Sequence, residues 1–204
     1  MASLVVVDYG AGNLTSVANA LSYIGEKPIV SSSPEEILSA DRLVFPGVGA
    51  ARSAMDILNA KGIGNAIAEV VKRGNPVLGI CIGCQIILEE SEEDGGVKTL
   101  GLLPGRAVRF LSEPGIKIPH MGWNNLEHVN GECKILKDVP ETSDFYFVHS
   151  YVICPEDNSV IKAVADYGIK VPSVVQFNNI YACQFHPEKS GKYGLKILEN
   201  FCNA

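Results

Sequence analysis

The amino-acid sequence predicts an α/β fold, a single-domain open, mostly parallel sheet flanked by helices, with additional antiparallel strands in the C-terminal half. Before Gly101, short β-rich runs alternate with helix-length amphipathic segments, a pattern typical of parallel sheets. After Gly101 the runs are shorter and closer together, which favours antiparallel pairing. No repeat, low-complexity tract or linker divides the chain, so residues 1–204 are expected to form one domain.

The elements of the first half follow from apolar spacing and from stop signals. The run Leu4 to Asp8 predicts a first strand, and the spacing from Leu14 to Ile24 predicts a helix that Gly25 ends. Further strands are expected at Pro28 to Ser31, Arg42 to Phe45 and Pro76 to Ile80. Helical patterns are expected around Glu35 to Ser39 and from Ala51 to Lys72.

The second half is predicted to be richer in strands. The expected strands are Val108 to Phe110, Tyr146 to Val148, Val160 to Ala165, Val174 to Phe177 and Tyr181 to Phe185. A helix from about Tyr193 to Phe201 should end the domain.

Composition excludes several classes of function. The chain has 17 basic and 23 acidic residues, a net charge of −6, which gives no basic footprint for nucleic acid. The apolar run Leu4 to Val7 is interrupted by Asp8, which makes it too short for a signal peptide or a membrane span. Six cysteines without a secretory signal suggest reduced thiols, so we expect a cytoplasmic protein.

The segment from Gly79 to Gly83 places a cysteine between two glycines directly after an apolar strand. This is the thiol form of a nucleophile elbow, in which a sharp strand-to-helix turn presents the nucleophile at the edge of a sheet. The helix expected from Gln85 through Leu88 would favour the thiolate of Cys81. A tight turn around a buried thiol is the structural alternative. A redox or zinc pair of Cys81 with Cys84 fits poorly, because no second C-x-x-C exists.

A general base is available in the segment His186-Pro187-Glu188. Proline keeps the preceding residue extended, so side chains two positions apart should point to the same side. Glu188 can then orient His186 while the other imidazole nitrogen faces the thiol. The alternative is a surface turn without function.

The loop from Pro46 to Gly49 follows another expected strand and supplies candidate oxyanion donors. Gly47 and Gly49 allow backbone conformations that leave an N–H free, here that of Val48. The N–H after the nucleophile, that of Ile82, is the usual second donor. An ordinary Pro-Gly turn is the alternative. The loop at Gly10 is not a dinucleotide fingerprint, because Thr15 stands where the third glycine is needed, but Asn13 could face the same edge.

These segments resemble class I (triad-type) glutamine amidotransferases, whose pattern is Pro-Gly-x-Gly, Gly-x-Cys-x-Gly-x-Gln and His-Pro-Glu in that order. More narrowly, the chain is similar to the glutaminase subunits of imidazole glycerol phosphate synthases. That resemblance rests on three further segments, Asp8 to Leu14, Pro119 to Asn124 and Tyr146 to Tyr151, and runs essentially from end to end. Cys84 is the one departure, because the family more often has methionine there. We interpret it as a packing residue, although a disulfide with Cys81 under oxidation is the alternative.

The resemblance implies hydrolysis of the glutamine side-chain amide through a Cys81 thioester, with no metal or organic cofactor. It places the substrate near Gln85 and the segment His149-Ser150-Tyr151, although these residues have nearly as good structural interpretations. The implied partner is a (β/α)₈-barrel cyclase subunit in a heterodimer, which uses the ammonia in histidine biosynthesis to make imidazole glycerol phosphate and aminoimidazole carboxamide ribotide.

Three alternatives remain open at this stage. The first is the glutaminase of another synthase, such as pyridoxal phosphate synthase, which often has Gly-Gly-Glu-Ser in place of Pro46 to Gly49. The second is a redox-sensing or chaperone-like α/β protein that keeps the cysteine without a His-Pro-Glu segment. The third is a catalytically silent regulatory subunit, which the complete Cys-His-Glu set disfavours.

Overall fold

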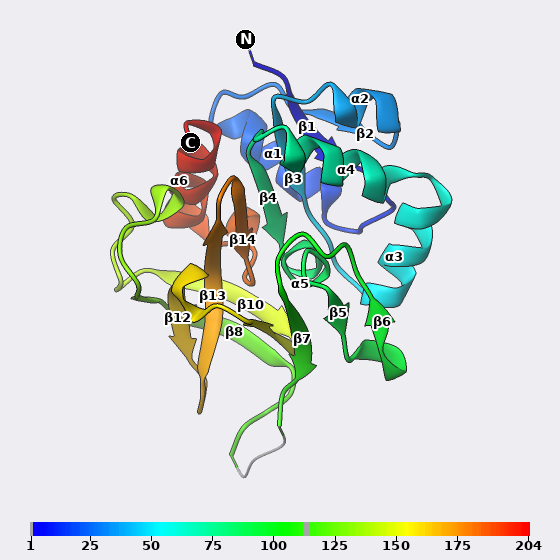
Figure 1. Cartoon of the computed structure of the whole chain (residues 1–204). Coiled ribbons are helices and arrows are strands. Elements are labelled where there is room, and N and C mark those ends of the chain that lie inside the picture. Colours follow the sequence, from blue (N-terminus) through cyan, green and yellow to red (C-terminus); the bar gives the residue numbers. More distant parts are fainter. Residues whose placement is uncertain (1, 112–114) are drawn as a thin grey trace.

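The computed structural model describes residues 2–111 and 115–204, and an eight-stranded sheet runs through its centre (Figure 1). In spatial order the strands are β2 (Ile29–Ser31), β1 (Leu4–Val7), β3 (Arg42–Phe45), β4 (Val77–Ile80), β14 (Ile180–Cys183), β13 (Lys170–Phe177), β12 (Ile161–Asp166) and β9 (Glu127–His128). The first five strands are parallel and the remaining pairings are antiparallel. The predicted fold class is confirmed.

Two smaller sheets pack beside this one. The first pairs β8 (His120–Asn125) with β10 (Asp144–His149), and the second joins β11 (Tyr151–Pro155), β7 (Gly105–Arg109), β5 (Glu90–Ser91) and β6 (Val97–Lys98). The chain passes from β10 to β11 through the single residue Ser150, so one short crossing links the two sheets.

Helices cover both faces of the central sheet (Figure 1). On one face lie α2 (Pro34–Leu38), α3 (Ala51–Ala60), α4 (Ile63–Lys72) and α5 (Ile82–Ile86), and on the other lie α1 (Leu14–Tyr23) and α6 (Gly191–Cys202). Single 3₁₀ turns lie at Glu93–Gly95, Lys134–Leu136, Asn158–Val160 and Pro187–Lys189.

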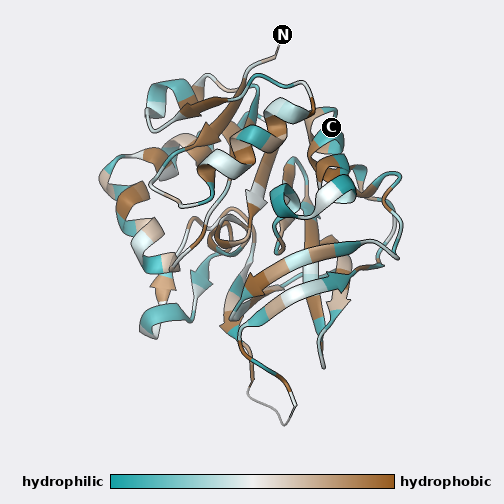
Figure 2. Cartoon of the chain, turned by 180° about the vertical axis from the view of Figure 1, so that it is seen from behind, coloured by the Kyte–Doolittle hydropathy of each residue, from teal (hydrophilic) through white to brown (hydrophobic). Residues whose placement is uncertain are grey.

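The core follows the alternation of side chains along the strands. Val5 and Val7 pack with α3 and α4, whereas Leu4 and Val6 pack with α1 and α6. A strand buried on both faces reads as a continuous apolar run, which is why β1 has the sequence Leu-Val-Val-Val. Figure 2 shows mainly hydrophobic residues along the central strands and mixed hydropathy on the helices.

The structure differs from the sequence predictions at several elements. The helix expected over residues 51–72 is two helices, α3 and α4, because Gly62 between them has a φ of +70°. The helix expected to run to Leu88 ends at Ile86. The predictions missed β8 and β11 as strands, and β13 begins at Lys170 rather than at Val174.

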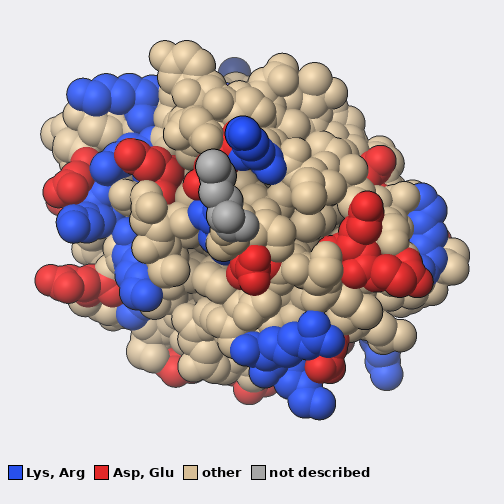
Figure 3. All heavy atoms as spheres, turned by 90° about the horizontal axis from the view of Figure 1, so that it is seen from above, with Lys and Arg blue, Asp and Glu red and all other residues tan. Residues whose placement is uncertain are grey.

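Among residues 2–111 and 115–204, no helix is long and apolar enough to cross a bilayer. Figure 3 shows one face of the molecule, on which basic and acidic side chains both occur and most of the area is uncharged.

We expect Gly83→Ala to destabilise the fold by about 3 kcal/mol, because overpacking of a close backbone contact is costly. A β-carbon at Gly83 would overlap the carbonyl group of Phe45. Urea unfolding followed by far-UV circular dichroism measures the change. Gly64→Ala is the control, since its β-carbon would meet only the end of the Leu100 side chain. Equal midpoints for the two variants would contradict the prediction.

Candidate active site

Cys81 lies on a sharp turn between β4 and α5. Its backbone has φ +54° and ψ −104°, a region that residues with a side chain rarely adopt. The Cys81 N–H donates to the Cys183 carbonyl at 2.8 Å, which ties the turn to β14. The glycines flanking it are required by space, because a β-carbon at Gly79 would come within 2.9 Å of the Gly83 backbone. The geometry is that of a nucleophile elbow with its thiol 5% exposed.

His186 and Glu188 form a buried pair. His186 Nδ1 lies 2.8 Å from Glu188 Oε1, and both side chains are fully buried. The 3₁₀ turn Pro187–Lys189 sets this geometry, rather than the continued extended chain that the sequence argument assumed. Asn13, at the start of α1, donates from Nδ2 to the same carboxylate oxygen at 3.1 Å. Glu188 is therefore held by two side chains and faces the imidazole directly.

The surroundings of His186 raise its pKa to about 9. Burial lowers the pKa, but the hydrogen bonds and negative charge of Cys81 and Glu188 together outweigh it. Nδ1 is taken by Glu188, which leaves Nε2 available for the thiol. In this structure Nε2 has no hydrogen-bond partner within the described residues, and the Cys81 thiol instead lies 4.0 Å from the Val148 carbonyl oxygen. The structure thus brings the three predicted triad residues together as nucleophile, base and orienting carboxylate.

The loop after β3 contacts the turn at Cys81. The Gly47 carbonyl in this loop accepts a hydrogen bond from the Ile82 N–H, which is one of the two predicted oxyanion donors. The Ile82 N–H donates to the Gly47 carbonyl oxygen at 3.4 Å. Within a planar trans peptide the C=O and the following N–H point in opposite directions. The Val48 N–H therefore points away from Ile82 in this structure, and the two predicted oxyanion donors do not converge.

A cavity of about 340 Å³ surrounds the thiol. Its lining residues are Val48, Gly49, Cys81, Ile82, Gln85, Glu93, Pro119, Val148, His149, Ser150, Tyr151 and His186. Every residue predicted for the site lines this cavity except Gly47 and Glu188, which lie directly behind it against Ile82 and His186.

Two predicted substrate residues are already engaged by the protein. Gln85 Nε2 donates to the Tyr151 carbonyl at 3.3 Å and lies 3.4 Å from Gln184 Oε1. His149 Nδ1 donates to the same carbonyl at 2.8 Å, which leaves Nε2 as the acceptor for His120 Nδ1 at 3.1 Å. Burial lowers the pKa of His149 to about 3 and that of His120 to about 4. Both rings are neutral at pH 7 and shape the cavity wall.

Sequence reasoning missed Glu93 and the contact that Asn13 makes. Glu93 lines the cavity, and its Oε2 accepts from the Ala51 N–H at 2.5 Å. Burial raises the Glu93 pKa, only partly opposed by this hydrogen bond. Glu93 stands in the acidic run Glu92-Glu93-Asp94, which looks like a solvated surface, so the sequence holds no signal for it.

The remaining thiols are not arranged for metal or redox chemistry. Within residues 2–111 and 115–204, no group of three or more His, Cys, Asp or Glu side chains could hold a metal ion. All six cysteines are free, and Cys84 is fully buried, with a pKa raised by that burial. Its contacts are those of a packing residue in α5.

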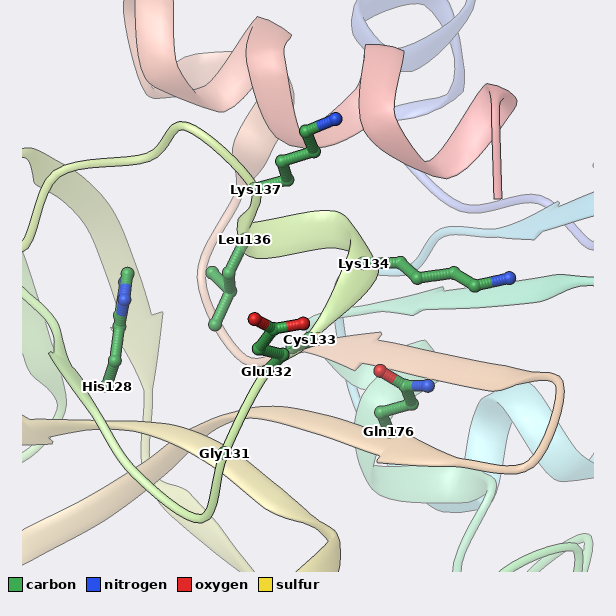
Figure 4. Close-up of a pocket in the computed structure, with 8 residues that line it drawn as sticks. All are labelled: His128, Gly131, Glu132, Cys133, Lys134, Leu136, Lys137 and Gln176. Atoms are coloured by element: carbon green, nitrogen blue, oxygen red, sulfur yellow. The ribbon is translucent and has the colours of Figure 1, made fainter.

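A larger cavity of about 800 Å³ lies elsewhere, around the turn Lys134–Leu136. In Figure 4 the Lys134 and Lys137 side chains point away from its middle, while Glu132 points into it. Its polar groups do not converge on one point, as the groups of a catalytic site must. The smaller cavity at Cys81 is the candidate active site.

The fold and the site together are those of an α/β enzyme, with a cysteine on a sharp strand-to-helix turn beside a buried His-Glu pair. The chain belongs to the class-I glutamine amidotransferase family, whose model matches residues 5–204. It is 47% identical over 198 residues to the imidazole glycerol phosphate synthase subunit HisH of Dehalococcoides mccartyi strain CBDB1, covering 97% of this chain and 95% of that protein.

A second HisH subunit and two solved structures are also similar to this chain. The HisH subunit of Desulfitobacterium hafniense strain DCB-2 is 46% identical, with 96% of this chain and 92% of that protein covered. A solved glutamine amidotransferase superimposes with a TM-score of 0.76 at 20% identity, covering 97% of this chain and 98% of the other. PurLQS from Thermotoga maritima gives a TM-score of 0.75 at 19% identity, covering 100% and 99%. At these identities the structures support the fold alone.

Glu188→Gln should lower the pKa of His186 well below 9, because burial then acts on the imidazole with less opposition. A ¹⁵N NMR titration of the His186 ring measures this pKa.

The same pair should make the stability of the fold depend on pH. The folded pKa of His186 is raised above the unfolded value near 6.5, so its contribution to folding stability is complete below pH 6.5 and is lost as the pH rises through 9. The difference in unfolding free energy between wild type and variant should therefore shrink over that range. The control is the exposed Glu132→Gln, and an unmoved His186 titration in Glu188→Gln would refute this assignment.

Proposed function

We propose that this chain is the glutaminase subunit of an imidazole glycerol phosphate synthase, which hydrolyses glutamine and passes ammonia to a cyclase subunit. The main support is the similarity, over nearly the whole chain, to relatives that bear the HisH subunit name. The supporting chemistry is that Cys81 and His186 line one cavity, with Glu188 paired to His186 behind it.

In the proposed mechanism the Cys81 sulfur attacks the amide carbon of glutamine while His186 holds the thiol proton. Glu188 stabilises the resulting imidazolium and fixes its tautomer. His186 then protonates the departing ammonia, which leaves a γ-glutamyl thioester on Cys81. Water hydrolyses the thioester with His186 again as the base, and glutamate is released.

The cavity also accounts for recognition of an amino acid. Glu93 lines the cavity, and its carboxylate is suited to an α-ammonium group, while Ser150 and Tyr151 line the same cavity. Gln85 Oε1 is buried without a hydrogen-bond partner among the described residues. We therefore assign Glu93 to the substrate ammonium group and the segment His149–Tyr151 to the opposite wall.

A partner surface adjoins the site. Strand β8 exposes Met121 and Trp123, which are 60% and 59% accessible. The Trp123 ring lies 5.8 Å from that of Tyr146, and Tyr146 lies 6.4 Å from the His186 ring. Lys189 Nζ lies 5.9 Å from the Tyr146 ring centroid. An aromatic patch with a neighbouring cation is typical of an interface centre. We propose that the (β/α)₈-barrel cyclase docks here, where ammonia leaves the triad.

The resting geometry of the oxyanion loop explains why the partner matters. With the Ile82 N–H bonded to the Gly47 carbonyl, the tetrahedral intermediate lacks its donors. Docking would favour the rotated peptide that presents the Val48 N–H, so that glutamine is not hydrolysed without an acceptor for ammonia.

Six free thiols favour a reducing compartment, and we propose the cytoplasm.

Ammonia release from glutamine should be low for the purified chain and should rise at least tenfold with a cyclase subunit and its nucleotide ligand. The expected cause is conversion of the loop to its working form. A coupled glutamate dehydrogenase assay with ammonia controls measures the rate, and Cys81→Ala should abolish it in every mixture. Full activity without a partner would contradict the role of the loop, and no activity in any mixture would contradict the function.

Trp123→Ala should weaken binding to the cyclase about 30-fold, the effect of losing about 2 kcal/mol at an interface centre. Isothermal titration calorimetry measures the dissociation constant. Tyr23→Ala on α1 removes a side chain that is 80% exposed and lies outside the patch, so its binding should be unchanged. Equal affinities for the two variants would move the interface elsewhere.

A further inference from the structure

Tyr9 is a buried residue of the site region that the mechanism above does not use. It follows β1 directly and is 3% exposed, and its ring packs on Phe45 with a centroid separation of 5.4 Å. The Tyr9 hydroxyl oxygen is buried and has no hydrogen-bond partner within residues 2–111 and 115–204. Buried tyrosine hydroxyls are normally paired, because an unpaired one is unfavourable. The exception requires an explanation.

The hydroxyl lies against the oxyanion loop. A β-carbon built on Gly47 would overlap the Tyr9 hydroxyl oxygen, so this oxygen sits directly over the Gly47 α-carbon. Gly47 is also the residue whose carbonyl accepts from the Ile82 N–H at 3.4 Å, a long hydrogen bond. The unpaired donor and the carbonyl that blocks the oxyanion site are thus immediate neighbours.

Release of the Ile82 N–H requires the peptide between Gly47 and Val48 to rotate. That rotation removes the Gly47 carbonyl from its present donor, and a carbonyl turned into the protein needs another. Burial raises the Tyr9 pKa above its usual value, as does the nearby negative charge of Cys81, so the hydroxyl keeps its proton. It is a donor at every pH at which the enzyme works.

We propose that Tyr9 is a positioning residue, whose hydroxyl donates to the Gly47 carbonyl in the working conformation and so holds the Val48 N–H toward the oxyanion. The inference rests on the proposed glutaminase function. In a trans peptide the C=O and N–H are opposed, so a carbonyl held by Tyr9, which is not among the residues lining the cavity, would turn the Val48 N–H away from Tyr9. In the resting conformation the same hydroxyl is unpaired, which favours departure from that state.

Tyr9→Phe tests this inference, because it removes only the hydroxyl. In the complex with the cyclase, kcat for ammonia release should fall about tenfold, the effect of one buried hydrogen bond, with KM within twofold of wild type. In the isolated chain the thermal midpoint should stay the same or rise, because an unpaired buried hydroxyl has been deleted. Alkylation of Cys81 by iodoacetamide needs a thiolate but no oxyanion donor, so its rate should change less than twofold.

Tyr181→Phe is the matched control. Tyr181 is also 3% exposed, but it packs with Phe201 on the other face of the sheet, so its removal should leave kcat unchanged. An unchanged kcat in Tyr9→Phe would overturn the inference. So would a kcat loss accompanied by a lower thermal midpoint and slower alkylation, the pattern of a general packing defect. Wild-type complex without glutaminase activity would instead overturn the proposed function, which keeps the two failures distinct.

Discussion

Backbone contact between the end of β3 and the first turn of α5 is the constraint on which the candidate active site depends. Gly83, in the first turn of α5, approaches the Phe45 carbonyl so closely that no β-carbon fits between them. This contact places the loop after β3 within hydrogen-bond distance of Ile82. Cys81 and the candidate oxyanion donors therefore follow two different strands, β4 and β3. The contact between Gly83 and Phe45 sets the distance between them. An α/β sheet brings such loops to one edge, and the glycines set their separation there.

The buried imidazoles of His186 and His149 both line the cavity at Cys81. They have different hydrogen-bond partners, and their pKa values are shifted in opposite directions. His186 faces a carboxylate, and its pKa is raised to about 9. His149 faces the Tyr151 carbonyl and His120, which are not anions, so burial dominates and lowers its pKa to about 3. Burial alone would make all of them neutral. Only the imidazole with a fixed carboxylate has a raised pKa, so Glu188, held by Asn13, distinguishes His186 as the candidate base.

The sequence allows prediction of those parts of the fold that rest on local patterns. The parallel half is predictable because its strands are buried on both faces, so their apolar runs stand out. Strand β8 was missed because His120-Met-Gly-Trp-Asn-Asn alternates exposure against one neighbour and resembles a loop. The proximity of His186 to Glu188 could be predicted because the two residues stand in one short motif. Glu93 and the contact of Asn13 with Glu188 could not, because each acts across a long separation in the chain.

The proposed regulation demands little energy. A partner shifts a two-state loop only by its differential affinity for the two states, and a tenfold gain corresponds to about 1.4 kcal/mol. In the structure, one hydrogen bond from the Ile82 N–H to the Gly47 carbonyl holds the loop after β3 in place. At 3.4 Å this hydrogen bond is long and therefore weak. Its loss is offset by pairing of the Tyr9 hydroxyl in the inferred working form. In the proposed scheme, contacts at the patch of Trp123 and Tyr146, whose rings lie near His186, would select the working state of the loop.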